Sequence, residues 1–222
     1  MMTRPRPDID VTAHLIEPEM PRGRPAEEAP APIVWAAFFG DDRPVEFEVG
    51  SGKGLFLANA ARARPDRNFL GVEISRKYAR LAAERLARQG IANARVWSGD
   101  VHEVLRRIPD RSLRAVHVYF PDPWWKKRHK KRRVLTGALV AQIERTLQPG
   151  GELHVASDVE EYFNLIRELI AASPRFREWP TPEPKSPEHE LDYLTNFERK
   201  YRLEGRPVYR ASYDYRPTAA SS

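Results

Sequence analysis

Residues 45–54 read VEFEVGSGKG, and the fold class follows from this stretch. Val45 to Val49 predict a buried strand that runs directly into a loop with glycines at Gly50, Gly52 and Gly54, and the apolar stretch LFLANAARA after it predicts a helix. A strand, a glycine loop and a helix in this order open a nucleotide-binding α/β unit. The glycines let the backbone turn sharply and approach a ligand closely. The chain is therefore predicted to have an α/β fold with a parallel sheet.

The spacing of the glycines narrows the choice of ligand. A dinucleotide-binding loop has its third glycine one residue later, where Leu55 stands, and a Walker loop ends in Gly-Lys-Ser/Thr. Neither pattern matches. The acid Glu48, just before the first glycine, favours S-adenosylmethionine, because that cofactor carries no phosphate and has an ammonium group that a carboxylate can hold. A glycine loop by itself is a weak signal.

Two further predicted strands also deliver acids at their ends. The stretch NFLGVE ends at Glu73, which is placed to accept hydrogen bonds from ribose hydroxyls, and the strand ARVW is followed by Asp100, which is placed to accept from an adenine amino group. Alternatively, Glu73 merely precedes a helix capped by Ser75, and Asp100 is a turn or capping acid. Parallel strands end at one edge of a sheet, so Glu48, Glu73 and Asp100 together favour a cofactor site.

Residues 119–133 read YFPDPWWKKRHKKRR and follow another predicted strand. The prolines on either side of Asp122 fix φ and remove two backbone donors, which predicts a stiff loop at the end of the strand. Seven of the eight residues from Lys126 to Arg133 are Lys or Arg. Charge concentrated in this way indicates a polyanionic partner. The plainer alternative is a proline turn followed by a solvated run of charge.

The chain after this block continues the α/β pattern. Residues 134–147 predict a helix, the strand ELHVA follows, and Ser157-x-x-Glu160 has the form of a capping box that opens the next helix. Asp158 is then either an acid of the first helical turn or a side chain facing the same edge as Asp122. Pro207 to Tyr215 predict a last strand, antiparallel to the others.

Bulk composition sets the remaining limits. The chain has 222 residues, a net charge of +6 and no cysteine, and its six histidines show no paired spacing, so we expect no disulfide framework and no metal. It has no apolar run of membrane-spanning length and no signal-peptide core, so we expect a soluble, cytoplasmic protein. Residues 1–32 carry seven prolines and predict a mobile arm, residues 33–216 predict one domain, and residues 217–222 predict a short disordered tail.

The motifs FEVGSGKG, GVEIS, SGD, YFPDPWWKKRHKKRR, ASDVEEY and TNFE follow one another in this order. Together they closely resemble the bacterial tRNA (guanine-N7)-methyltransferases, from about residue 42 to residue 215. The Phe-Pro-Asp-Pro-Trp loop with its basic continuation is the specific part of the resemblance. The resemblance implies a doubly wound, seven-stranded, mostly parallel, Rossmann-like methyltransferase sheet with one antiparallel strand near the C-terminus. The chain departs from the family pattern at Trp125 and in its proline-rich arm.

The resemblance also implies site residues, beside those that the residues themselves suggest. For S-adenosylmethionine, which leaves as S-adenosylhomocysteine, the expected positions are Glu48, Glu73, Asp100 and Asp122, together with the loop glycines Gly50, Gly52 and Gly54. For the substrate they are Lys126, Asp158, Thr195, Asn196, Phe197 and Glu198. Further tRNA contacts are expected from Trp124, Arg128, Lys130, Lys131, Arg132 and Arg133. The implied partner is tRNA, with no membrane and no obligatory protein partner.

The chemistry of the base decides what these residues would do. Guanine N7 carries a lone pair and no proton, so its methylation needs alignment more than a general base. The base becomes cationic, which an acid accepting from its N1 and N2 hydrogens would stabilise, and Asp122 is the first candidate with Asp158 and Glu198 as partners. Trp124 either stacks on the purine or fills the core.

Two alternatives stay open. One is a methyltransferase acting on an exocyclic amine, whose loop usually reads Asn/Asp-Pro-Pro-aromatic, whereas here Asp122 is followed by one proline and then Trp124. The other is an RNA-binding module without activity. Acids at every expected strand end argue against the second alternative.

Overall fold

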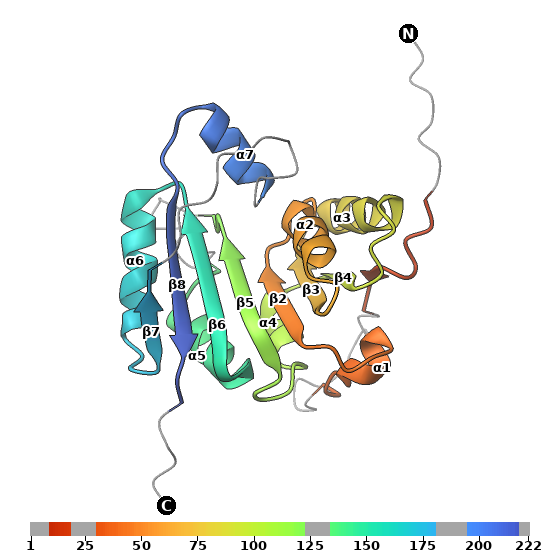
Figure 1. Cartoon of the computed structure of the whole chain (residues 1–222), viewed down its shortest axis with the longest axis horizontal. Helices are drawn as coiled ribbons and strands as arrows, with labels where there is room; N and C mark the ends of the chain where they lie inside the picture. The colour runs from red at the N-terminus through yellow and green to blue at the C-terminus, as the bar shows by residue number, and fades with distance from the viewer. Residues whose placement is uncertain (1–8, 19–29, 123–133, 181–194, 218–222) are drawn as a thin grey trace, which may run out of the picture.

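The computed structural model describes residues 9–18, 30–122, 134–180 and 195–217, which build a layered α/β structure (Figure 1). The strands are β1 (Leu15–Ile16), β2 (Val45–Val49), β3 (Asn68–Glu73), β4 (Ala94–Ser98), β5 (Leu113–Tyr119), β6 (Leu147–Ser157), β7 (Phe176–Trp179) and β8 (Tyr209–Tyr215). The helices are α1 (Trp35–Phe39), α2 (Leu55–Ala63), α3 (Arg76–Arg88), α4 (Val101–Leu105), α5 (Gly137–Thr146), α6 (Glu160–Ala171) and α7 (Asn196–Leu203).

The strands form one sheet in the order β1-β4-β3-β2-β5-β6-β8-β7. Neighbouring strands from β1 to β6 pair in parallel, whereas β8 pairs antiparallel with both β6 and β7. The chain moves outward from β2 to β4 on one side, and then from β5 to β6 on the other, so the order reverses between β2 and β5 (Figure 1). The predicted doubly wound, mostly parallel sheet with an antiparallel strand near the C-terminus is confirmed. Ligands of such sheets bind where the order reverses, at the carboxyl ends of the strands.

The sheet has eight strands and not the predicted seven. The additional strand is β1, in which Leu15 and Ile16 pair with Val96 and Trp97 of β4. Arg95 Nη1 also donates to the carbonyl oxygen of Ala13 at 2.8 Å. This part of the region predicted as a mobile arm is therefore a strand at the edge of the sheet, because two apolar side chains and a few backbone hydrogen bonds anchor it there.

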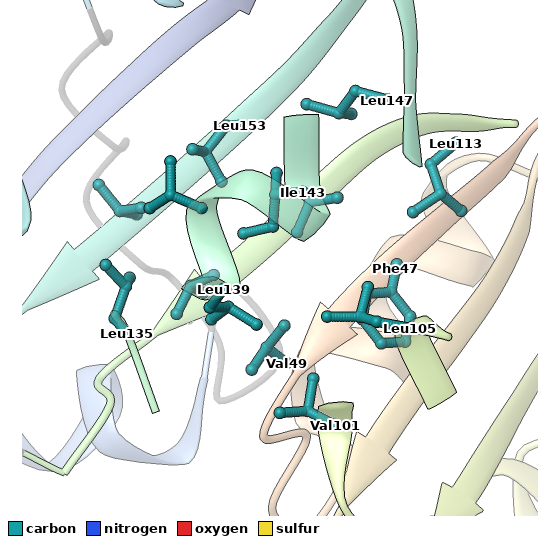
Figure 2. Close-up of a cluster of buried hydrophobic side chains, with 14 of the residues drawn as sticks. Phe47, Val49, Val101, Leu105, Leu113, Leu135, Leu139, Ile143, Leu147 and Leu153 are labelled. Carbon is teal, nitrogen blue, oxygen red and sulfur yellow. The ribbon is translucent and has the colours of Figure 1, made fainter. Parts of the chain in front are cut away.

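The two faces of β2 differ in character. Phe47 and Val49 pack, together with Val45, into the larger core, which α4, α5 and α6 complete, and Figure 2 shows Phe47 and Val49 near Leu105 and Leu139. Helices α2 and α3 cover the opposite face of β2, β3 and β4 with a second apolar cluster. The alternating side chains of β2 on that opposite face are acids, which places charged groups under α2.

The start of one helix and the cap of another differ from the prediction. Helix α5 begins at Gly137 and not at Val134, because Thr136 caps it by accepting a hydrogen bond from Leu139 N at 3.2 Å. Helix α6 begins at Glu160, as predicted, but the residue before it, Val159, makes no side-chain cap. The predicted capping box is wrong, since Ser157 is still part of β6 and its hydroxyl accepts from Val159 N at 3.1 Å.

Candidate active site

The glycine loop after β2 has the backbone that only glycine adopts easily. Gly50, Gly52 and Gly54 have φ values of 75°, 53° and 71°. A Cβ at Gly50 or Gly52 would meet no atom within 4 Å, so the loop borders open space at the sheet edge. A Cβ at Gly54 would lie 2.8 Å from the Cβ of Ala82, so this glycine lets the start of α2 pack against α3.

Glu73 joins the glycine loop to the loop after β3. Its Oε2 accepts from Gly52 N at 2.8 Å and its Oε1 accepts from Ser75 N at 2.8 Å. Ser75 in turn caps α3 by accepting from Tyr78 N. The structure thus places Glu73 beside the glycine loop, where it braces two loops, and directly before the helix that Ser75 caps, as the plainer interpretation expected.

Glu48 is a buried acid at the end of β2, with an exposed fraction of 3%. Within the part of the chain that the structure describes, its Oε2 has no hydrogen-bond partner. Burial, and then the charge of Glu73, raise the pKa of Glu48 to about 8. A positively charged ligand group would supply the missing partner, so the donor set fits a cofactor with an ammonium.

The raised pKa predicts how the ligand-free protein responds to pH. The carboxyl of Glu48 has an ordinary pKa of 4.5 and a folded pKa of about 8, so the stability it contributes is complete below pH 4.5 and is lost as pH rises to about 8. In the wild type, the free energy of unfolding should fall by up to about 1.4 kcal/mol per pH unit because of this group. We expect Glu48→Gln to remove this slope. Urea unfolding at pH 5.5, 7 and 8.5 measures the difference between the two slopes.

The matched control for this measurement is Glu84→Gln, which changes a helical glutamate paired with Arg80 and Arg88 on the surface. Its slope should equal that of the wild type, because exposed pairs contribute little. Equal slopes for wild type and Glu48→Gln would show that Glu48 is ionised in the folded protein throughout this range.

Asp100 caps α4, since its Oδ1 accepts from His102 N at 2.7 Å, and its side chain is exposed. Strands β2, β3 and β4 are neighbours in register, with Val49 opposite Val72 and Glu73 opposite Ser98. The acids Glu48, Glu73 and Asp100 therefore follow one another along the carboxyl edge of the sheet.

Ile74 is a residue of this edge that sequence reasoning missed. It directly follows Glu73, and 74% of its surface is exposed, which is unusual for a large apolar side chain. Tyr78, one turn into α3, is 42% exposed, and the Nζ of Lys53 lies 5.7 Å from its ring centre. The available signal was an apolar residue between a strand-end acid and a capping serine, where a solvated position would favour a polar residue.

The loop after β5 brings Asp122 to the point where the strand order reverses. Phe120 has a φ of 51°, although a bulky residue rarely adopts this conformation, and its N donates to the Ala156 carbonyl at 2.8 Å. Pro121 is buried, whereas Asp122 is exposed. Backbone strain of this kind concentrates at functional sites. The turn at Phe120 directs the chain away from the sheet, so that Asp122 lies beside the end of the strand that carries Glu48.

The acids predicted for the substrate lie beyond β6 and on α7. Asp158 follows β6, and its Oδ2 lies 2.5 Å from Nη2 of Arg206. Thr195 Oγ1 accepts from Glu198 N at 3.0 Å, and the buried Glu198 pairs through Oε1 with Arg210 Nη2 at 2.5 Å. Figure 1 shows α7, which begins with the predicted Asn196 and Phe197, above the carboxyl ends of β5 and β6. The other predicted contacts lie outside the described residues: Trp124, Lys126, Arg128, Lys130, Lys131, Arg132 and Arg133.

A buried polar network under α2 was not predicted. The Nε2 of His117 lies 2.8 Å from Oε2 of Glu46, and its Nδ1 lies 3.0 Å from the hydroxyl of Tyr119. Glu46 also pairs with Arg64 at 3.0 Å and with Arg67. The signal was present in the polar residues at alternate positions of VEFEV and RAVHVYF, whose period of two places them on one face.

Two kinds of feature are absent from the residues that the structure describes. No group of three or more His, Asp or Glu side chains there could hold a metal ion, and no helix there is long and apolar enough to cross a bilayer. The expectation of an enzyme without metal stays a prediction.

Comparison with known proteins identifies the family. Residues 42–211 match a family model described as "Putative methyltransferase". A tRNA (guanine-N(7)-)-methyltransferase of Rhodopirellula baltica is 45% identical over 219 residues, which cover 96% of this chain and 78% of that protein. The chain belongs to this family of tRNA (guanine-N7)-methyltransferases. The corresponding protein of Alcanivorax borkumensis is 41% identical over 172 residues, covering 77% of this chain and 72% of its relative.

Among solved structures, the crystal structure of a 16S rRNA methyltransferase, KamB, matches the fold of this tRNA (guanine-N7)-methyltransferase family member. The TM-score is 0.56 at 17% identity, and the match covers 82% of this chain and 94% of the other. At this identity the likeness concerns the fold, which is that of methyltransferases.

Proposed function

We propose that this protein transfers a methyl group from S-adenosylmethionine to N7 of a guanine in the variable loop of tRNA. The membership in the tRNA (guanine-N7)-methyltransferase family supports the reaction. The observation that supports the assignment to a site is the buried carboxyl oxygen of Glu48, which has no hydrogen-bond partner among the described residues, beside the glycine loop and at the edge where Asp122 is exposed.

The cofactor would be held by the edge formed by β2, β3 and β4. Glu48 would pair with its ammonium group, and Glu73 would accept from ribose hydroxyls with the lone pairs that its two backbone donors leave. Asp100 would accept from the adenine amino group, and the exposed side chain of Ile74 would pack on the adenine face. When bound, the cofactor supplies a methyl group on a positively charged sulfur and leaves as S-adenosylhomocysteine.

The substrate side of the site would bind and orient the base. Guanine N7 needs no deprotonation, so the protein contributes alignment and charge. Asp122, Asp158 and Glu198 would lie around the edge of the sheet where the base binds, the last two each beside an arginine. A carboxylate that accepts from N1–H and N2–H binds the base more strongly as it becomes cationic, which lowers the barrier. Thr195 would hold the start of α7, and with it Glu198, through the cap that the structure shows.

The tRNA backbone would be bound by the basic segment that follows Asp122. We propose phosphate contacts from the basic residues between Lys126 and Arg133, and stacking or packing by Trp124. Six or more such phosphate contacts would lower affinity on the order of a thousandfold between low and moderate salt. A tRNA substrate also favours a cytoplasmic enzyme, and this chemistry requires no metal.

The test uses labelled methyl transfer to two tRNA transcripts that differ only in carrying guanine or adenine at the target position of the variable loop. We expect label on the guanine transcript alone, with strand scission after borohydride and aniline treatment, which detects N7-methylguanine. Label on both transcripts would move the target elsewhere or to an exocyclic amine. Binding of the cofactor without any transfer would favour a role in RNA binding.

A further inference from the structure

Asp158 and Glu198, the two acids beyond β6 that are proposed to face the substrate, each form an ion pair with an arginine. Oδ2 of Asp158 lies 2.5 Å from Nη2 of Arg206, and Oε1 of Glu198 lies 2.5 Å from Nη2 of Arg210. The two arginines come from the same segment, in the loop before β8 and near the start of β8. The carboxylates are thus occupied by two guanidinium groups from one chain segment.

The occupant has the chemistry of the proposed substrate. A guanidinium is a planar carbon bonded to three nitrogens, with N–H groups that point in parallel at a carboxylate. The Watson–Crick edge of guanine presents the same unit, since N1–H and the N2 amino group flank one ring carbon. A carboxylate that is well placed for one of these groups is also well placed for the other.

The two pairs differ in how easily they exchange. Arg210 belongs to β8 and stands opposite Ala156 of β6, and its partner Glu198 has an exposed fraction of 1%, so separating this pair would bury an unpaired charge. The side chain of Arg206 is 42% exposed and lies in a loop. Because Arg206 reaches solvent, a ligand can replace it at Asp158 at a lower cost than it could replace Arg210 at Glu198.

The surroundings of Arg206 also lower the cost of displacing it. Its Nη1 lies 3.7 Å from Oε2 of Glu204, so the guanidinium keeps a carboxylate nearby if it leaves Asp158. Only 12% of the side chain of Asp158 is exposed, so a ligand would reach its carboxylate by displacing Arg206.

From this geometry we propose that Asp158 binds the Watson–Crick edge of the target guanine, and that Arg206 is a positioning residue which occupies this place until the base displaces it. Arg210 is a second positioning residue, which fixes Glu198 permanently. The inference rests on the proposed guanine substrate. Because the self-contact must open before the base binds, it lowers the apparent affinity by the fraction of molecules that are open.

The test measures equilibrium dialysis of guanosine, which carries the base edge and no phosphate, against the full chain saturated with S-adenosylhomocysteine. Arg206→Gln should bind guanosine about two- to fivefold more tightly than the wild type, because it lacks the competing guanidinium. Arg206→Lys keeps a cation at Asp158 and should stay close to the wild type. Adenosine, which presents one donor and one acceptor, should bind equally to all three proteins.

A double-mutant cycle isolates the pair. In an Asp158→Asn background, Arg206→Gln should leave the guanosine affinity unchanged. Arg167 of α6 is a similarly exposed arginine, and its Nη2 lies 3.0 Å from Oε2 of Glu178. Arg167→Gln should therefore have no effect on guanosine affinity in either background.

Unchanged or weaker guanosine binding by Arg206→Gln would overturn the proposal. If this variant also binds tRNA more weakly than the wild type does, Arg206 is a phosphate contact instead. If Arg206→Gln does not fold, an affinity of Arg206→Lys that exceeds the wild type more than twofold would contradict the retained ion pair. Failure of the proposed function is distinguished separately, because it is detected as absent methyl transfer by the wild type and not by dialysis.

Discussion

Replacing Asp122 with alanine should slow methyl transfer to tRNA by on the order of a hundredfold to a thousandfold, at saturating tRNA and S-adenosylmethionine. The side chain is exposed at the end of β5, next to the strand that carries Glu48. A carboxylate there is expected to act on the base as it becomes cationic, so its loss affects the transition state more than substrate binding. Single-turnover rates with excess enzyme measure this effect apart from product release.

Three variants make this result interpretable. Asp122→Asn keeps the size and removes the charge, so it should lose most of the rate if charge is the essential property. Asp42→Ala changes an exposed aspartate at the opposite end of β2 and should keep the wild-type rate. Because Asp122 is exposed, its variants should unfold within about 0.5 kcal/mol of the wild type. A wild-type rate in Asp122→Ala would remove this residue from the mechanism.

The centre of the fold could be predicted from the sequence because its signals are local. The strand over Val45 to Val49 was predicted with the bounds it has, since a glycine loop follows an apolar run directly. Helix α3 was predicted with its Ser75 cap because a serine directly before an amphipathic stretch is also a local signal. In contrast, β1 consists of two residues and has no periodicity to detect, and only its pairing with β4 makes it a strand.

The partners of the site residues could not be predicted, because tertiary contacts decide them. Arg206 is 48 residues from Asp158 along the chain, and no local pattern connects the two. The same holds for Glu46 and His117, which are 71 residues apart. Sequence reasoning identifies acids at strand ends, but the cations that compensate them depend on the folded arrangement.

Glu46 is the buried charge whose loss should destabilise the protein most. Its side chain has no exposed surface, and it contacts His117, Arg64 and Arg67. Glu46→Ala would leave these groups without their shared carboxylate, and removal of one partner from a buried ion pair typically costs about 3 kcal/mol or more. Urea unfolding at pH 7 measures the difference in the free energy of unfolding. Glu84→Ala, which breaks only surface pairs, should cost below about 0.5 kcal/mol.

The pH dependence of this difference tests its electrostatic origin. Burial opposes ionisation of Glu46, but the hydrogen bond from His117 and the nearby arginines outweigh it and lower its pKa from 4.5 to about 2. Its contribution is therefore complete above pH 4.5 and is lost as pH falls to about 2. The gap between wild type and Glu46→Ala should narrow over this range. A gap that stays constant down to pH 2.5 would mean that lost packing, and not the lost charge, destabilises the variant.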